Sequence, residues 1–485
     1  MLSFEAWFDT FFNAPFDIND LLNNLDSSWA LIVYLLGIAA AIDAIWNGRT
    51  SQGTLAWVVA LTFIPFITLP LYLFLGSRKF HGYKKAHKSS LKVLQRINRH
   101  SFIPQLYRSN TPSSATFPLE QLARLPQTKH NKVQLLIDGE QTFERIFEEI
   151  EAAEHSILVQ FYIINDDQLG KRLQQALIKK AQQGLNIYFL YDQIGSPNIS
   201  SPFLKAMTSA GIQCSRFNPF KLHKRLQLNF RNHRKLIVID NKCCFIGGHN
   251  IGDEYLSQNA KLGRWRDTHL QINGPATLAA QLSFVEDWHW AQDEILKLDW
   301  TPNISTANSN VLIISGGPAD AFETTSLSFV QLIQQAKQRL WIATPYFIPD
   351  LKVMGALQLA ALKGIGIQII LPKKTDNLIL TLAMKSYVTE LSQLGISFYQ
   401  YEAGFMHQKV MLIDQNICCI GSANLDNRSL RINFELNAII ECKKLANEVE
   451  EMLSNDLKHC QPYPETKHFW LTFLSKAARL LSPIL

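Results

Sequence analysis

Two segments of the chain carry the same chemically active side chains at the same spacing. In each, a histidine is followed by a lysine two residues later, an aspartate seven residues later and an asparagine seventeen residues later. The residues are His233, Lys235, Asp240 and Asn250 in the first segment and His407, Lys409, Asp414 and Asn424 in the second. An imidazole can attack or carry a proton, and ammonium and amide groups donate hydrogen bonds to anions. The repeated set therefore predicts one site in which both segments converge on a single anion.

The spacing within each segment predicts how a strand positions these side chains. The lysines are followed by short apolar runs, Leu236–Ile239 and Val410–Ile413, which are typical of a buried strand. Because side chains alternate along a strand, the histidine and the lysine share one face, whereas the aspartate points to the other. We therefore expect the histidines and lysines to be the active pairs. Asp240 and Asp414 are expected to close the strand-to-turn junction, as the supporting members of each catalytic motif.

The duplicated pattern resembles the phospholipase D superfamily, in which two such halves pack about a pseudo-twofold axis and form one site. The flanking segments are similar to those of the bacterial cardiolipin synthases, and the resemblance runs from the first apolar segment to the C-terminus. These segments are Gly247–Tyr255, Trp265–His269, Asp287–Trp288, Thr344–Asp350, Gly421–Ser429 and Asn433–Glu435.

The resemblance implies transfer of a phosphatidyl group in two displacements. One histidine attacks the phosphorus of a first phosphatidylglycerol while the other protonates the departing glycerol, which leaves a phosphatidyl-histidine. The second histidine then deprotonates a hydroxyl of another phosphatidylglycerol, which takes the phosphatidyl group and becomes cardiolipin. By the usual family order His233 is the nucleophile and His407 the acid and base, although the symmetry of the two halves leaves the reverse order open.

Further residues receive roles from the same resemblance. The lysines and asparagines of both motifs would hold the phosphate oxygens as charge shifts. In the superfamily an acidic residue some distance after each motif histidine orients its ring, which assigns this role to Asp267 in the first half and Glu435 in the second. A surface carboxylate is the alternative for each. Arg266 and Tyr346 are candidates for substrate contact, and Tyr346 could equally be a core aromatic residue.

No metal or cofactor is expected. The sequence has no carboxylate cluster at metal-ligand spacing and no Gly-rich loop ending in Lys and Ser or Thr, so nucleotide use is not predicted. Two other functions stay open. One is a membrane-tethered phospholipase D-type phosphodiesterase that hydrolyses phospholipid or another phosphodiester, and the other is a catalytically inactive membrane scaffold. Two complete motifs disfavour the scaffold.

The distribution of charge limits the possible binding partners, and the cysteines indicate the redox environment. The net charge is +6, and residues 78–108 hold nine Lys or Arg and no Asp or Glu. Such a block binds anionic lipid headgroups, binds nucleic acid or serves as a solvated linker, and its place directly after an apolar segment favours the lipid surface over nucleic acid. Seven cysteines include the adjacent pairs Cys243-Cys244 and Cys418-Cys419. We expect these to be buried apolar residues in strands rather than zinc ligands, in a reducing compartment.

Two apolar stretches, Trp29–Trp46 and Leu55–Leu75, have roughly the length that spans a bilayer, and the short polar link between them makes a hairpin. A pair of core helices is the alternative. Asp43 weakens the first span, and Pro65 and Pro70 favour a kinked or partly re-entrant second one. Because positive residues gather after the second stretch, the positive-inside rule places the main body on the cytoplasmic side. The resemblance to the bacterial cardiolipin synthases implies that the membrane is the bacterial inner membrane, which the chain would cross more than once.

The alternation of strands and helices after residue 130 predicts a duplicated α/β domain on a mixed, largely parallel sheet, and the resemblance implies that its two copies are related by a pseudo-twofold axis. The C-terminal residues form a basic amphipathic helix that either lies on the membrane or packs on the domain. The expected parts are an interfacial or disordered segment (1–28), the membrane hairpin (29–76), a basic segment and linker (77–130), the two domains (131–305 and 306–462) and the amphipathic segment (463–485). The expected strands include Val133–Ile137, Ser156–Ile163, Asn186–Tyr191, Val311–Ile314, Leu340–Ala343 and Ile367–Leu371.

Overall fold

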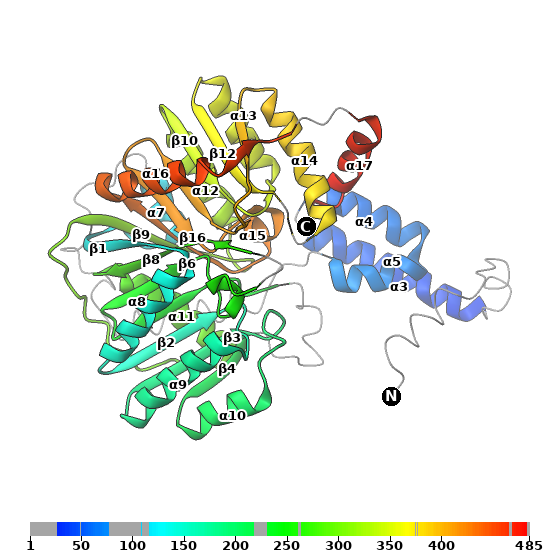
Figure 1. Cartoon of the computed structure of the whole chain (residues 1–485). Coiled ribbons are helices and arrows are strands. Elements are labelled where there is room, and N and C mark those ends of the chain that lie inside the picture. Colours follow the sequence, from blue (N-terminus) through cyan, green and yellow to red (C-terminus); the bar gives the residue numbers. More distant parts are fainter. Residues whose placement is uncertain are drawn as a thin grey trace. The chain divides into compact units, whose positions relative to one another are not determined.

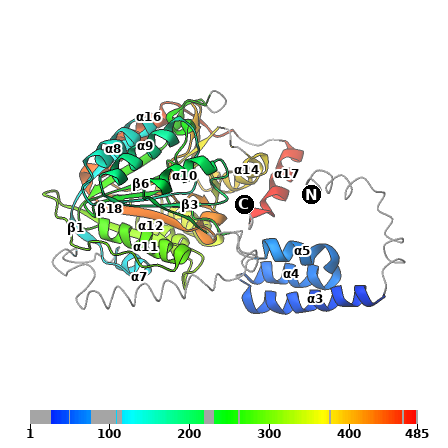
Figure 2. The same ribbon diagram turned by 90° about the horizontal axis from the view of Figure 1, so that it is seen from below.

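The computed structural model describes residues 27–48, 50–76, 108, 116–217, 230–259, 263–373, 375, 377–464 and 468–482. They belong to two compact units, Met1–Lys79 and Phe80–Leu485, which we treat separately (Figures 1 and 2). The expected interfacial segment at the N-terminus and the basic block of residues 78–108 lie almost entirely outside the described residues.

Three apolar helices form the described part of the first unit: α3 (Ser27–Asn47), α4 (Ser51–Phe63) and α5 (Pro65–Leu75). Among the described helices α3 is the one that is long and apolar enough to cross a membrane, and most of its large side chains are exposed. The predicted second span is divided at Ile64. Pro65 lacks the backbone N–H that would continue α4, so the chain breaks and a new helix begins there. The kink was predicted, but the replacement of one span by two short helices was not.

The single carboxylate of α3 is satisfied by neighbours within the first unit. Tyr72 of α5 donates its hydroxyl hydrogen to one oxygen of Asp43 at 2.7 Å, and Asn47 donates its side-chain amide to the other at 2.9 Å. The ring of Tyr72 packs edge-on against Trp57 of α4, with the centroids 5.2 Å apart. A carboxylate among apolar side chains requires such partners. Asp43 therefore ties α3 to α5.

A fifteen-stranded sheet runs through the second unit in the order β19-β13-β12-β10-β15-β16-β18-β9-β1-β8-β6-β5-β2-β3-β4. Outward from the central β9–β1 pair, each strand of the first half has a counterpart in the second, so the order itself shows the repeat. The strands are β1 (Thr128–Ile137), β2 (Ser156–Phe161), β3 (Asn186–Asp192), β4 (Gln213–Phe217), β5 (Leu236–Ile239), β6 (Cys243–Gly247), β8 (Thr268–Asn273), β9 (Ser309–Gly316), β10 (Arg339–Ala343), β12 (Gly366–Pro372), β13 (Ser397–Tyr401), β15 (Val410–Ile413), β16 (Ile417–Gly421), β18 (Glu435–Glu441) and β19 (Cys460–Pro462).

The expected strands are confirmed to within a few residues, but the expected predominance of parallel pairing is wrong. Only β2–β3, β3–β4, β10–β12 and β12–β13 pair in parallel within this sheet. The motif strands β5 and β15 instead run antiparallel to β2 and β10 and turn back at once into β6 and β16. Helical crossovers, which parallel pairing requires, occur only in the outer part of each half.

Helices cover both faces of the sheet (Figure 2). In the first half α8 (Asp138–Ala152), α9 (Gln168–Gln182) and α10 (Ser201–Ser209) pack on one face and α11 (Thr277–Gln292) on the other. In the second half α12 (Thr324–Gln335), α13 (Leu351–Leu362) and α14 (Leu378–Ser392) oppose α16 (Lys443–Leu457). This arrangement confirms the two repeated α/β domains.

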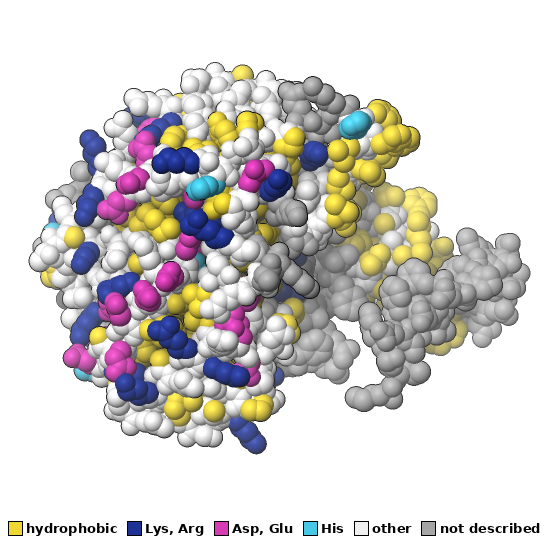
Figure 3. Space-filling view, in the orientation of Figure 1, with side chains coloured by type: hydrophobic (Ala, Val, Ile, Leu, Met, Phe, Trp, Pro, Cys, Tyr) yellow, Lys and Arg dark blue, Asp and Glu magenta, His cyan; other side chains and the backbone are white. Residues whose placement is uncertain are grey.

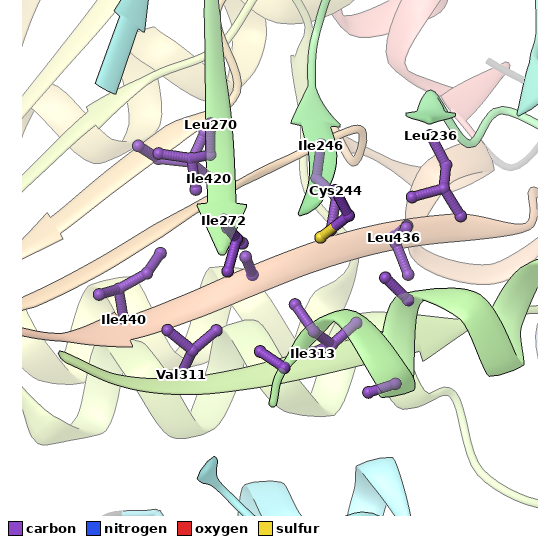
Figure 4. Packing of buried hydrophobic residues seen from close by; sticks show 14 of the residues in the cluster. Leu236, Cys244, Ile246, Leu270, Ile272, Val311, Ile313, Ile420, Leu436 and Ile440 are labelled. Atoms are coloured by element: carbon purple, nitrogen blue, oxygen red, sulfur yellow. The ribbon is translucent and has the colours of Figure 1, made fainter. Parts of the chain in front are cut away.

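One apolar core is shared by the two halves. Figure 4 shows Leu236, Cys244 and Leu270 of the first half in the same cluster as Ile420 and Leu436 of the second. All four cysteines of the adjacent pairs are buried in strands, as expected. A common core makes each half depend on the other for the burial of its apolar surface.

The segment expected to be a linker is partly folded. Helix α7 (Phe117–Ala123) packs against β9 and α12 of the second half, and β1 begins at Thr128. Pro118 stands in the first turn of α7, where its missing N–H costs nothing. The Pro- and Ser-rich segment that was expected to be a linker therefore also includes the start of a helix.

The C-terminal helix α17 (Phe469–Arg479) packs on α14 with one face. Arg479 donates to the carboxylate of Glu390 at 2.6 Å, and the Tyr387 hydroxyl donates to Ser482 Oγ at 3.0 Å. The other face leaves its apolar side chains exposed, and Figure 3 shows them gathered over α17. Of the two placements left open for this helix, on the membrane or on the domain, the structure shows that one face packs on the domain.

Candidate active site

Each motif histidine is held next to a strand of the opposite half. The backbone N–H of His407 donates to the Arg266 carbonyl at 2.8 Å, which extends the small parallel pair of β14 (Phe405–Met406) and β7 (Trp265–Arg266). In the mirrored position, the N–H of His233 donates to the Phe434 carbonyl at 2.9 Å. The acidic residues Asp267 and Glu435 come directly after these partner residues. Backbone pairing therefore decides which carboxylate each histidine meets.

Both histidines open into one cavity of about 530 Å³. Most of each histidine side chain is buried, with 12% of His233 and 10% of His407 exposed. Two imidazoles that are far apart in the chain therefore face one cavity. The lining residues are Tyr162, Ile163, Arg231, His233, Asn250, Tyr255, Trp265, Tyr346, Asn377, Leu380, Phe405, His407, Asn424, Asp426, Arg428 and Asn433.

The carboxylates that contact the histidines cross between the halves. Nδ1 of His233 lies 3.0 Å from both oxygens of Glu435, and Nδ1 of His407 lies 2.6 Å from Oδ2 of Asp267. The sequence distances assigned each carboxylate to the histidine of its own half, and that pairing is wrong. Because the segments pair across the two halves, each half supplies the carboxylate for the other's histidine.

Burial and charge set the protonation of these pairs. Burial lowers the pKa of His233 to about 4 and that of His407 to about 3, although the carboxylate beside each ring opposes the shift. Burial alone would raise the pKa of Asp267 and Glu435, but the neighbouring lysine charges and the hydrogen bonds from the histidine rings outweigh it and lower both. Both carboxylates are thus ionised, and both imidazoles of the free protein are neutral near pH 7.

The two motif lysines lie behind the histidines rather than on the cavity lining. Each ammonium donates to the carbonyl of its own motif histidine, at 2.6 Å for Lys235, and the pair Lys409–His407 makes the same contact. Lys235 Nζ also lies 5.5 Å from the ring centre of Tyr162. Burial lowers the pKa of Lys409 to about 8 and that of Lys235 well below its usual value.

The motif asparagines both line the cavity. Asn250 accepts from the Ile163 N–H at 3.1 Å and donates to the Tyr255 hydroxyl at 2.9 Å. Asn424 donates to Asp426 at 3.1 Å, while its buried Oδ1 has no hydrogen-bond partner among the described residues. Each amide is therefore positioned on the wall that faces the histidines.

The motif aspartates contact backbone and not the cavity. Asp240 accepts the backbone N–H groups of Glu154, His155 and Ser156, each at 2.8 Å. Asp414 accepts those of Lys337, Gln338 and Arg339 at 2.8 to 3.2 Å. Both residues adopt positive φ angles, 52° and 50°, at the turn that follows the strand. These contacts are those of a carboxylate that closes a strand-to-turn junction.

The two expected substrate contacts differ in outcome. Tyr346 lines the cavity, whereas Arg266 does not. Arg266 is 2% exposed and is held by Asp456, at 2.6 and 2.9 Å, and by Asp138 at 3.0 Å. Its guanidinium is therefore occupied in a buried ion-pair network that joins α16 to the first half, and the substrate role expected for it is not supported.

Sequence reasoning missed several residues of the site. Tyr162 follows β2, and its ring centre lies 5.0 Å from that of His233. Ser422 donates to Glu435 at 2.5 Å, while its counterpart in the first half is Gly248, where a Cβ would lie 2.0 Å from Asp267 Oδ1. The small residues at these two positions, in the Gly-Gly pair before Asn250 and the Gly-Ser pair before Asn424, are the sequence feature that could have indicated the contact, because only a small residue fits beside an orienting carboxylate.

Among the described residues, no three His, Cys, Asp or Glu side chains come close enough to hold a metal ion.

The fold and the crossed histidine–carboxylate pairs define a phospholipase D-like protein with two halves. The family model described as "Cardiolipin synthase, PLD-like domain" matches residues 146–270 and 329–457, and one described as "Phospholipase_D-nuclease N-terminal" matches residues 35–77. The chain belongs to the cardiolipin synthase family.

Curated relatives and a solved structure agree with this assignment. The chain is 40% identical to cardiolipin synthase A of Pseudomonas putida strain F1 over 94% of its own length and 97% of the relative's. It is 39% identical to cardiolipin synthase A of Pseudomonas aeruginosa strain LESB58, covering 93% and 95% of the two chains. The crystal structure of phosphatidylserine synthase from Haemophilus influenzae Rd KW20 superposes with a TM-score of 0.59 at 15% identity, covering 77% of this chain and all of that one. That likeness concerns the fold.

Proposed function

We propose that the protein is a cardiolipin synthase that transfers a phosphatidyl group from one phosphatidylglycerol to another. The observation that carries the proposal is the pair of motif imidazoles facing one cavity, each with a buried carboxylate on Nδ1. A carboxylate on Nδ1 fixes the tautomer and directs Nε2 toward the reacting atom. Two such nitrogens on opposite sides of one phosphorus suit two successive displacements, in which one imidazole first receives the phosphatidyl group and then gives it up to a second alcohol.

In the first displacement one neutral imidazole attacks phosphorus, and the P–O bond to the glycerol headgroup breaks. The other imidazole supplies the proton that the departing glycerol oxygen requires. Its low pKa in the free protein does not exclude this, because an anionic phosphodiester placed between the rings favours the protonated form. The product is a phosphatidyl-histidine and free glycerol.

In the second displacement the now neutral second imidazole removes the proton of a hydroxyl on another phosphatidylglycerol. The resulting oxygen attacks the phosphatidyl-histidine, the P–N bond breaks and cardiolipin forms. Asn250 and Asn424 on the cavity wall would donate to the phosphate oxygens, and the buried ammoniums of Lys235 and Lys409 would stabilise the added negative charge. By family order we assign His233 as the nucleophile and His407 as the acid and base.

The protein is also proposed to work at the bacterial inner membrane, with the second unit on its cytoplasmic side. The exposed apolar surface of α3 supports the attachment to a membrane. The positive charge of residues 78–108, which follows the apolar helices, supports the orientation. Attachment would hold the site at a surface crowded with acceptor lipid and raise its effective concentration over that of water. A lipid alcohol rather than water would then take the phosphatidyl group.

The test is incubation of purified protein with phosphatidylglycerol vesicles and analysis of the products. Cardiolipin with an equal amount of glycerol is expected, and His233→Ala and His407→Ala should each reduce it at least a thousandfold. Phosphatidic acid as the sole product would identify the alternative, a phospholipase D-type phosphodiesterase. Acid-free quenching followed by peptide mapping of the phosphorylated histidine would show which half attacks.

A further inference from the structure

Two arginines on the cavity lining have no part in the proposed displacements. Arg231 precedes the first motif histidine by two residues, and Arg428 lies on α15 (Asn427–Arg431) in the second half. Their backbones are held by adjacent residues of one segment: Phe434 donates its N–H to the Arg231 carbonyl at 2.8 Å, and Asn433 donates to the Arg428 carbonyl at 2.8 Å. The fold therefore brings one guanidinium from each half to the same wall.

Tyr162 interacts with both His233 of the reacting centre and the arginine pair. Its ring packs edge-on against His233, with the centroids 5.0 Å apart, and its hydroxyl interacts with the Arg231 guanidinium. Burial raises the pKa of Tyr162 and the neighbouring Asp192 adds to this, while the charges of Arg231 and Arg428 act in the opposite direction. One aromatic ring therefore separates the guanidiniums from the imidazole that we assign as the nucleophile.

The two positive charges stand close together in a partly buried place. Burial lowers the pKa of Arg428, and the charge of Arg231 lowers it further. Nη1 of Arg231 is buried and has no hydrogen-bond partner among the described residues. A buried guanidinium N–H without an acceptor destabilises the folded protein, and a ligand that supplies the acceptor would remove this cost.

The carboxylates nearby are already used by the backbone. Asp192 accepts the N–H groups of Asn232, Ile194 and Gly195 at 2.8 to 2.9 Å. Asp426 accepts the N–H of Ser429 at 2.7 Å as well as the amide of Asn424. Both carboxylates reduce the repulsion between the arginines, but their oxygens are engaged in holding the loops.

We propose that Arg231 and Arg428 form a second phosphate subsite, which binds the phosphodiester of the acceptor lipid while the donor phosphorus lies between the two histidines. This inference rests on the proposed function. An acceptor phosphatidylglycerol carries its own phosphate only three carbons from the hydroxyl that attacks, so a second anion enters the cavity during transfer. Forked guanidiniums match the geometry of phosphate oxygens. Water and neutral alcohols have no such group, so the pair would select an anionic lipid acceptor.

A competition between two acceptors tests this subsite. Vesicles would contain phosphatidylglycerol together with labelled monoacylglycerol, a neutral lipid alcohol with a similar free hydroxyl. Both products, cardiolipin and the phosphatidyl ester of monoacylglycerol, arise from the same phosphatidyl-histidine. Effects on donor binding and on the first displacement therefore cancel in the ratio of the two products.

The ratio of cardiolipin to the phosphatidyl ester of monoacylglycerol is expected to fall at least tenfold in Arg231→Gln and in Arg428→Gln. Arg428→Lys keeps the charge but loses the fork, so its ratio should fall less. Arg172→Gln, an exposed arginine on α9 outside the cavity lining, is the control and should keep the wild-type ratio. If a glutamine variant does not fold, Arg231→Lys and Arg428→Lys carry the test through the same ratio.

An unchanged ratio in the arginine variants would overturn the subsite, whether or not total turnover falls, because it would mean that the pair acts on the donor or on the fold. The failure of the proposed function looks different. In that case the wild-type protein forms neither product and releases phosphatidic acid alone.

Discussion

Nδ1 of His407 lies 2.6 Å from Oδ2 of Asp267, although 140 residues separate the two in the chain and they belong to different halves. The same exchange joins His233 to Glu435. Parallel pairing of β7 with β14, and of Asn232 with Phe434, aligns each histidine segment with the acidic segment of the other half. Neither half alone therefore contains a complete histidine–carboxylate pair, so the two halves must associate for either pair to form.

The first prediction concerns these carboxylates as positioning residues. Asp267→Asn and Glu435→Gln should each lower kcat by about 10²–10⁴, because a neutral amide no longer fixes the tautomer of the ring it contacts. KM for phosphatidylglycerol should change little, since neither side chain lies on the cavity lining. Initial rates in mixed micelles at several surface concentrations of lipid would separate the two parameters.

Glu441→Gln provides the control for these variants, because it changes a carboxylate on the same strand as Glu435 but outside the site. It should keep the wild-type kcat. A rise in KM with an unchanged kcat in Asp267→Asn would show that the carboxylate acts on substrate binding and not on the histidine.

The second prediction compares two Gly→Ala substitutions. A Cβ at Gly248 would lie 2.0 Å from Asp267 Oδ1, so Gly248→Ala should displace the carboxylate and lower activity at least a hundredfold. Gly355 lies within α13 and has nothing within 4 Å of its added Cβ. Gly355→Ala should therefore keep full activity and raise the free energy of unfolding by about 0.5–1 kcal/mol. Equal activity of the two variants would contradict the packing described for Asp267.

The third prediction concerns the pH dependence of stability. Burial lowers the folded-state pKa of His233 to about 4 and of His407 to about 3, below the value of about 6.5 for an unfolded histidine. Between these limits the unfolded chain binds protons that the folded protein does not. The stability that each histidine contributes is thus present above about pH 6.5 and is lost as the pH falls toward 4, by at most about 1.4 kcal/mol per pH unit for each group.

Thermal unfolding of the His407→Gln protein between pH 7 and pH 5 would measure this contribution. The decrease in Tm with falling pH should be shallower than in the wild-type protein, whatever the difference in Tm at pH 7. His468→Gln, which changes an exposed histidine before α17, should keep the wild-type slope. Parallel slopes for the wild-type and His407→Gln proteins would show that folding does not lower the pKa of this ring.

Much of the fold could be predicted because the local signals agree with the tertiary structure. The runs Leu236–Ile239 and Val410–Ile413 are strands with those bounds, and the repeated histidine, lysine and asparagine offsets correctly predicted equivalent places in two halves. The sheet's antiparallel centre was not predictable, because a buried strand has the same apolar run in either direction. Nor could composition separate a linker from the short helix α7.

The site was predictable at the motif level and failed where long-range pairing decides the contacts. Sequence distance placed Asp267 and Glu435 near motif histidines but could not tell which histidine each would meet, because that depends on pairing between the halves. Arg266 was a candidate for substrate contact, but its guanidinium is held in a buried ion pair instead. Its partner Asp456 lies 190 residues away.

The fourth prediction concerns the exposed face of α17. Phe473 and Trp470 are 55% and 72% exposed, while Ser475 and Ala478 on the opposite side are buried against the domain. Aromatic side chains with the exposed Lys476 among them suit the interface of an anionic membrane, where each buried apolar side chain contributes about 1.5–3 kcal/mol. We therefore expect this face to lie on the lipid surface while the other face stays packed on α14.

Full-length protein in vesicles containing phosphatidylglycerol would test this placement. A cysteine introduced as Phe473→Cys and labelled with a fluorophore should be quenched by lipids brominated on their acyl chains. The same label at Phe322→Cys, an exposed phenylalanine outside α17, should be quenched several-fold less. Since the two labels differ only in position, equal quenching would mean that α17 does not contact the bilayer. Its apolar face would then need another partner, because four large exposed apolar side chains on so short a helix are unfavourable in water.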